Sequence, residues 1–124
     1  MQFYIWVAGL QNELLEQIIA SELPGIHDTL QEVHFSLAMF TTTWIMTLFA
    51  KDASWPVAIR LFDHIVRRRS ADCALLRVIL AALRIHEDRI MAAPIDSGTL
   101  NERMTGLFRS LDAATTDRLL LLAV

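Results

Sequence analysis

Apolar residues recur at helical spacing along almost the whole chain, and this periodicity limits the possible fold more than any other feature. Two stripes of this kind lie near the N-terminus, and they comprise Leu14, Leu15, Ile18 and Ile19, then Leu23, Ile26, Leu30 and Val33. Pro24 disfavours helix at the residue before it, so the first helix is predicted to end near Ser21. Alternating apolar and polar runs are nearly absent, and no Asn-Gly or Asp-Gly turn occurs. The chain is therefore predicted to be all-α, with about six to seven packed helices.

The middle of the chain predicts two more helices, separated by a short polar stretch. The first should cover about Ser36–Ala50, and Ser54 is a suitable N-cap for the second, with Pro56 tolerated in its first turn. The residues of the second helix that follow the spacing of a core face are Ala58, Leu61, Phe62, Ile65 and Val66. Three consecutive arginines should close this helix, because cations favour the negative end of the helix dipole.

A fifth helix, from about Ala71–Met91, is predicted to lie at the centre of the fold. Arg77 is the only polar residue between Ala74 and Leu83, and a helix that is apolar nearly all round is usually buried on several sides. A buried arginine is costly without a partner, so we expect Arg77 to form a structural ion pair.

The C-terminal third predicts a loop and then further helix. Pro94 and Gly98 mark the loop, and Thr99 with Glu102 fits the spacing of a capping box. A last helix should cover about Ala113–Val124.

The composition is unusually apolar. Apolar residues make up 54% of the chain and charged residues 20%, against about 45–50% and about 25% in ordinary soluble domains. This excess predicts apolar surface that the chain cannot bury alone, and a missing half-domain, an oligomer partner or a membrane would cover it. The segment Val33–Ala50 lacks Asp, Glu, Lys and Arg, but it contains one His, one Ser and four Thr. It is also shorter than the ~20 predominantly apolar residues of a spanning helix, so membrane insertion is not favoured.

The charge balance and the positions of the cysteine, histidine and glycine residues argue against several classes of site. A net charge of −3, with fewer basic than acidic residues, argues against nucleic-acid binding. Cys73 is the only cysteine, so no intrachain disulfide can form, and we expect a buried, inert thiol. The four histidines and four glycines are dispersed, so neither a metal site nor a phosphate-binding loop is predicted, and no cofactor is expected.

Four segments in register resemble a known family. They are Leu23-Pro24 with Leu30, then Thr43-Trp44-Ile45-Met46-Thr47-Leu48-Phe49, then Ala58-Ile59-Arg60-Leu61-Phe62-Asp63, then Leu75-Leu76-Arg77-Val78-Ile79-Leu80-Ala81-Ala82-Leu83. Their order and spacing across Leu14–Met91 resemble the C-terminal part of the TBC domain, the helical fold of Rab GTPase-activating proteins. Phe62 stands where the family usually has tryptophan, so an aromatic plug is expected there without the indole N–H donor. By this resemblance, residues 1–124 are expected to form a single partial domain, the C-terminal lobe.

The resemblance also implies which chemistry to look for. The family accelerates GTP hydrolysis with an arginine in an Ile-x-x-Asp-x-x-Arg motif and a glutamine in Tyr-x-Gln. An arginine supplied in trans neutralises charge on the transferring phosphoryl group, and an amide orients the attacking water. Ile85-His86-Glu87-Asp88 has no arginine at the spacing that the first motif requires, and Trp6 stands two places after Tyr4, the only tyrosine. No catalytic residue is therefore predicted in this chain, which is expected to be inactive without a missing N-terminal half.

Five charged residues are candidates for contact with a partner, and they are Arg60, Asp63, Arg67, Arg68 and Arg69. Arg60 and Asp63 are three apart on one helix face, where the alternative to a partner contact is a local i,i+3 pair or a tie between helices. The three consecutive arginines suit an acidic partner or anionic lipid headgroups, and the alternative is a solvated helix end.

The resemblance implies a Rab-class GTPase as the partner and a role in vesicle trafficking, in the cytoplasm or at the surface of endomembranes. The first hypothesis is a non-catalytic C-terminal lobe that supports a catalytic half. The alternative is a catalytically dead helical module that binds a partner or dimerises through its exposed apolar surface.

Overall fold

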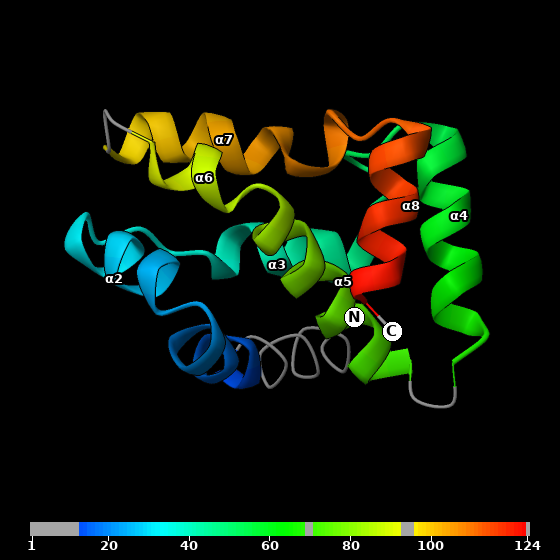
Figure 1. The fold of residues 1–124 in the computed structure, drawn as a ribbon, viewed down its shortest axis with the longest axis horizontal. Helices are drawn as coiled ribbons and strands as arrows, with labels where there is room; N and C mark the ends of the chain where they lie inside the picture. The colour runs from blue at the N-terminus through cyan, green and yellow to red at the C-terminus, as the bar shows by residue number, and fades with distance from the viewer. Residues whose placement is uncertain (1–12, 69–70, 93–95, 124) are drawn as a thin grey trace.

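A computed structural model describes residues 13–68, 71–92 and 96–123, with the backbone alone for 71–73. These residues form eight helices and no strand, which confirms the all-α prediction with one helix more than the upper estimate. Residues 13–22 are helical, and the later helices are α2 (Pro24–Glu32), α3 (Ala38–Thr47), α4 (Trp55–Val66), α5 (Ala71–Ile85), α6 (Glu87–Met91), α7 (Ser97–Arg109) and α8 (Ala113–Leu122) (Figure 1). The side chain of Cys73 lies outside the described residues, as does Tyr4.

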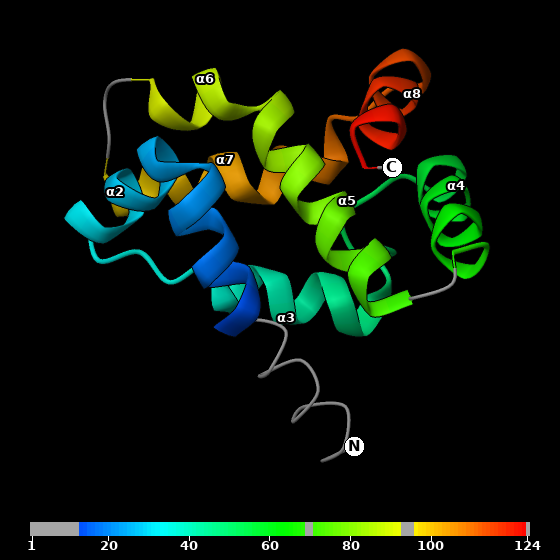
Figure 2. The same ribbon diagram turned by 60° about the horizontal axis from the view of Figure 1, so that its bottom comes forward.

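Helix α5 is the centre of the packing, as its apolar sequence predicted. It contacts α4, α6, α7 and α8 and runs between them (Figure 2). Val78, Ile79 and Leu83 are completely buried. The predicted length of this helix is wrong, because the backbone at His86 leaves helical geometry and a separate helix, α6, follows. The predicted burial of Arg77 is also wrong: the residue is exposed, and it makes no ion pair with any residue that the structure describes.

Helix α3 is shorter than predicted and ends in a left-handed turn. Leu48 and Phe49 have φ angles of 51° and 67°, so the chain leaves the helix there rather than at Ala50. The hydroxyls of Thr41, Thr43 and Thr47 donate to backbone carbonyls three or four residues earlier. These hydrogen bonds within the helix thus satisfy the hydroxyl groups of three threonines in the segment Val33–Ala50, which lacks Asp, Glu, Lys and Arg. Within the described residues, no helix is long and apolar enough to cross a membrane.

The tryptophan of α3 anchors the core. Trp44 is completely buried, and its ring meets that of Phe108 edge to face at 5.0 Å between centroids. Its indole N–H donates to the Asp52 carboxylate at 3.0 Å, and Arg109 lies 3.6 Å from the other carboxylate oxygen. Asp52 is only 8% exposed at its side chain. This hydrogen bond therefore ties the end of α3 to the polar turn that leads into α4.

The helix starts confirm the position of one predicted cap and correct another. Ser54 occupies the N-cap position of α4, although its side chain makes no capping hydrogen bond. The predicted capping box at Thr99 is wrong, because Asp96 is the N-cap of α7 and accepts from the Thr99 N–H at 2.8 Å. Asp112 caps α8 in the same way. Asp96 lies three residues before Thr99, so the helix begins earlier than the predicted capping box places it and Thr99 lies inside its first turn.

The two N-terminal helices follow the predicted stripes with one exception. Leu23 ends the first helix and Pro24 begins α2, whose Ile26 and Leu30 are buried. Leu14 belongs to the predicted core stripe but is 47% exposed. It faces a groove rather than the core.

Candidate functional site

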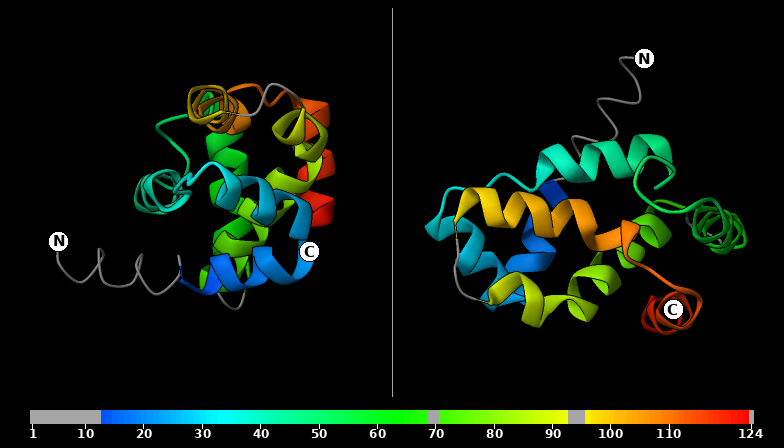
Figure 3. Two further views of the ribbon diagram at one scale, coloured as in Figure 1. Left: turned by 90° about the vertical axis from the view of Figure 1, so that its left-hand side faces the viewer. Right: turned by 90° about the horizontal axis from the view of Figure 1, so that it is seen from above.

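Helix α4 presents more apolar surface than its neighbours cover. It packs on α5 and α8, and Figure 3 shows it beside α8 at one end of the molecule. Its buried residues are Val57, Ala58, Leu61 and Ile65. Four others form an exposed row, the α4 stripe: Trp55 (72% exposed), Ile59 (49%), Phe62 (47%) and Val66 (54%). Their i, i+4, i+7, i+11 spacing places them on a single helix face.

The stripe overturns part of the predicted core. Phe62 and Val66 were expected to face inward, and Phe62 was expected to be an aromatic plug. Both are about half exposed because the helices that cover α4 lie on the side of Leu61 and Ile65. The sequence carried a signal that was not used: α4 has two adjacent apolar sets, which is wider than one buried face requires. Trp55 and Ile59 are absent from the predicted partner-contact residues.

A shallow groove runs along the α4 stripe. It has a volume of about 300 Å³ and lies between α4 and the end of α3. Trp55, Ile59 and Phe62 line one wall, and Leu48 and Ala50 line the other. The left-handed turn after α3 sets the second wall, because it redirects the chain at Leu48. Aromatic side chains beside a hollow are typical of the anchor positions of protein interfaces.

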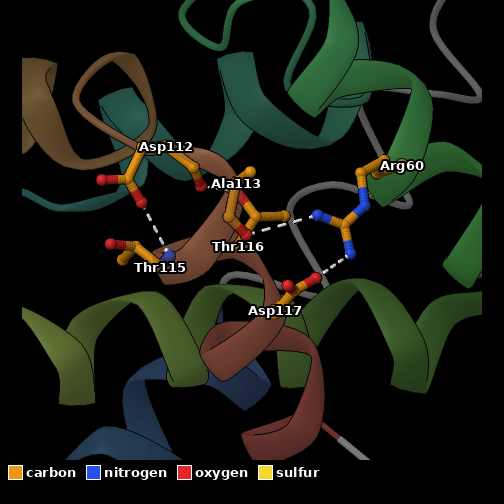
Figure 4. A network of polar contacts seen from close by, with 6 residues as sticks. All are labelled: Arg60, Asp112, Ala113, Thr115, Thr116 and Asp117. Atoms are coloured by element: carbon orange, nitrogen blue, oxygen red, sulfur yellow. Dashed lines mark hydrogen bonds and ion pairs between the residues drawn. The ribbon is translucent and has the colours of Figure 1, made fainter.

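Arg60 is tied to α8 rather than to Asp63. Its guanidinium pairs with the Asp117 carboxylate and also donates to the Ala113 carbonyl at 3.4 Å (Figure 4). Asp112, at the N-cap, holds the first turn of α8 in which Ala113 lies. The Arg60–Asp63 pair considered from the sequence is therefore absent among the described contacts, and the tie between helices takes its place.

The other predicted charges lie at the exposed edge of the stripe. Asp63 forms an i,i+4 ion pair with Arg67 at 3.0 Å, with side chains 55% and 76% exposed. Arg68 is exposed, and Arg69 lies outside the described residues. The structure thus brings Asp63, Arg67 and Arg68 together at the C-terminal end of α4, whereas the Arg60 side chain pairs with α8.

His64 lies at the same end of the helix and is partly buried. Partial burial lowers its pKa below 6.5, and the nearby Arg68 charge lowers the pKa further, while Asp63 opposes the shift. Its Nε2 atom has no hydrogen-bond partner among the described residues. No group of three or more metal-ligating side chains occurs in the described part of the chain. Apolar side chains with a charged rim have the composition of a protein-binding surface.

Comparison with known proteins adds a family. The sequence model of the Rab-GTPase-TBC domain matches residues 7–91. This range includes the α4 stripe and both walls of its groove, whereas α7 and α8 follow it. No curated protein and no solved structure matches the chain.

Proposed function

The chain belongs to the Rab-GTPase-TBC domain family, and on this premise we propose that it binds Rab-class GTPases through α4 without accelerating GTP hydrolysis. The observation that carries this proposal is the α4 stripe, an exposed apolar row with charged residues at one end. Such a row stays exposed in a stable domain chiefly where a partner covers it.

The non-catalytic part of the proposal rests on the sequence. These 124 residues contain neither Ile-x-x-Asp-x-x-Arg nor Tyr-x-Gln, the motifs that the TBC resemblance links to phosphoryl transfer. The matching segments resemble the C-terminal part of the domain. We infer that this chain is a C-terminal lobe, and that any catalysis requires an arginine and a glutamine from another segment. The proposed place of action is the cytoplasm, including the surface of endomembranes.

The residues of α4 have different roles in this proposal. Trp55 and Phe62 supply aromatic anchors, the residue class that dominates binding energy at protein interfaces. Asp63, Arg67 and Arg68 form a charged rim, which orients an approaching partner more than it adds affinity. Arg60 acts indirectly, because its bond to Asp117 links α4 to α8.

Binding to a panel of GTP-loaded Rab proteins tests this assignment. For any Rab that binds the wild-type chain, Phe62→Ser should lower the affinity by about tenfold or more, as expected for an interface anchor. Leu121→Ser is the matched control, because Leu121 is 77% exposed on α8 and lies outside the α4 groove. Equal binding by both variants would place the GTPase on another surface.

A second candidate function, dimerisation, is favoured by the spacing of the same row. The intervals between its residues are four, three and four, so the row reads the same in both directions. In an antiparallel two-fold pair, Trp55 would face Val66 of the second copy and Ile59 would face Phe62. Sedimentation equilibrium separates the two functions. A dimer that Phe62→Ser dissociates, together with no binding of any Rab, would support self-association instead.

A further inference from the structure

A second groove lies away from α4 and shares no lining residue with the first. It has a volume of about 450 Å³, and it is bounded by the helix of residues 13–22, by α5 and by the end of α8. Leu14 and Ile18 line one wall, and Leu76 and Leu80 line the other. Leu14 is 47% exposed, and Leu122 at the end of the groove is 53% exposed. The groove therefore leaves apolar side chains in contact with water.

The two walls have a geometry on which a further helix could pack. Leu14 with Ile18, and Leu76 with Leu80, are each i,i+4 pairs, so each wall is a short ridge of the kind that packs against a neighbouring helix. A third helix laid between two such ridges would contact both at once. Amphipathic helices that bind in grooves use apolar anchors at this same spacing.

The charges of the groove favour an acidic occupant. Glu22 and Arg84 neutralise each other across it at 3.0 Å. Arg77 also lines the groove, and it has no ion pair or hydrogen bond with a described residue. The residues three and four places before and after Arg77 on α5 are all uncharged, namely Cys73, Ala74, Leu80 and Ala81. The groove thus holds one positive charge that no described residue of its walls balances.

We propose that this groove binds an amphipathic helix of a partner protein, and that a carboxylate on the apolar face of that helix pairs with Arg77. The interaction is distinct from the GTPase contact proposed for α4. The apolar ridges provide the binding surface, and Arg77 selects helices with Asp or Glu over those with Lys. A partly desolvated carboxylate–guanidinium pair is stronger than one in open water, so the selection should be measurable.

The test uses a panel of synthetic helical peptides and the full 124-residue chain. Each peptide carries leucines at i, i+3, i+4 and i+7. One guest position on the leucine face is occupied by Glu, Gln or Lys, and this position is varied from peptide to peptide. Fluorescence anisotropy gives the affinity. At the best guest position, we expect Glu to bind about tenfold more tightly than Lys. Arg77→Glu should reverse this order. Arg68→Glu, the same change two residues after the end of α4 and outside this groove, should preserve it.

A second pair of variants tests the apolar walls. Leu14→Gln should weaken every peptide that binds, whereas Leu121→Gln, a more exposed leucine outside the groove, should not. Circular dichroism confirms that each variant is folded. The proposal is overturned if no peptide in the panel binds, or if the guest order is the same in wild type and Arg77→Glu.

Other occupants give separate results. A dimer that Leu14→Gln dissociates would assign the groove to a second copy of this chain and overturn the partner helix. A Rab protein that displaces the labelled peptide would assign it to the GTPase, with the same consequence. Loss of Rab binding in Phe62→Ser concerns α4 alone, so the failure of either proposal is distinguishable from that of the other.

Discussion

Removal of the Asp52 carboxylate should show how strongly α3 is bound to the turn before α4. In the wild-type chain, the buried indole N–H of Trp44 donates to Asp52 at 3.0 Å. Asp52→Ala leaves this donor without its acceptor in a place where Trp44 is completely buried. A buried polar group that loses its partner costs about 1–3 kcal/mol. We therefore expect the free energy of unfolding to fall by about 2 kcal/mol.

Two further variants separate the hydrogen bond from the charge. Asp52→Asn keeps an acceptor oxygen and removes the charge, so it should cost about 1 kcal/mol or less. Arg109→Ala removes the nearby cation, which is 3.6 Å from the carboxylate and 66% exposed. Because the Arg109 side chain is mostly in solvent and the distance is long, we expect the pair to contribute about 0.5 kcal/mol or less. The expected order of destabilisation is Asp52→Ala, then Asp52→Asn, then Arg109→Ala.

The assay is urea unfolding followed by far-UV circular dichroism. This signal reports helix content, so it does not depend on the fluorescence of a tryptophan whose environment the substitution alters. The slope of free energy against urea should be the same in all variants, because the surface exposed on unfolding is unchanged. The reasoning is refuted if Asp52→Asn is as unstable as Asp52→Ala, or if Arg109→Ala is the most destabilised. Either result would mean that charge, rather than the indole hydrogen bond, stabilises this turn.

Asp96→Ala and Asp112→Ala should each destabilise the chain, and Asn at either position should recover part of the loss, in the same urea assay. The backbone N–H groups at these helix starts hold the pKa of both carboxyls below 3.8, so their stabilisation is present above that pH and is lost as the pH falls through the lowered pKa. Burial lowers the pKa of His86 below 6.5, so on acidification the unfolded chain binds a proton at this residue before the folded chain does. The free energy of unfolding should therefore fall as the pH drops below about 6.5, and His86→Gln should reduce this pH dependence. The pair between Arg60 and Asp117 is half exposed, so Asp117→Ala should cost only about 0.2–1 kcal/mol, and a larger loss in urea unfolding would show that the bond to α8 is a major support of α4.

The sequence predicts the helices well because their cause is local. Helical periodicity and proline identify α2 and α4 within a few residues and the start of α5, and the central place of α5 follows from its apolar composition. The ends of α3 and α5 were missed because they depend on individual backbone angles, at Leu48 and at His86. No pattern of apolar residues encodes those angles.

Periodicity is a poor guide to which apolar face is covered. Phe62 and Leu61 are neighbours in the same apolar helix, but only Leu61 faces α5 and α8. Arg77 was expected to be buried because its helix is central, although its own face opens onto a groove. In both cases the outcome depends on where distant helices pack, which a single helix's sequence does not specify. Arg60 shows the same limit, since its partner Asp117 lies 57 residues away.

The measurement that tests the central claim most directly is single-turnover GTP hydrolysis by a panel of Rab proteins, with and without excess chain. The panel should include any Rab whose binding Phe62→Ser weakens. We predict that every Rab hydrolyses GTP at its intrinsic rate, even when it is bound by this chain. Acceleration of any Rab by the purified chain would contradict the account, because it would require catalytic groups other than the two motifs that this sequence lacks.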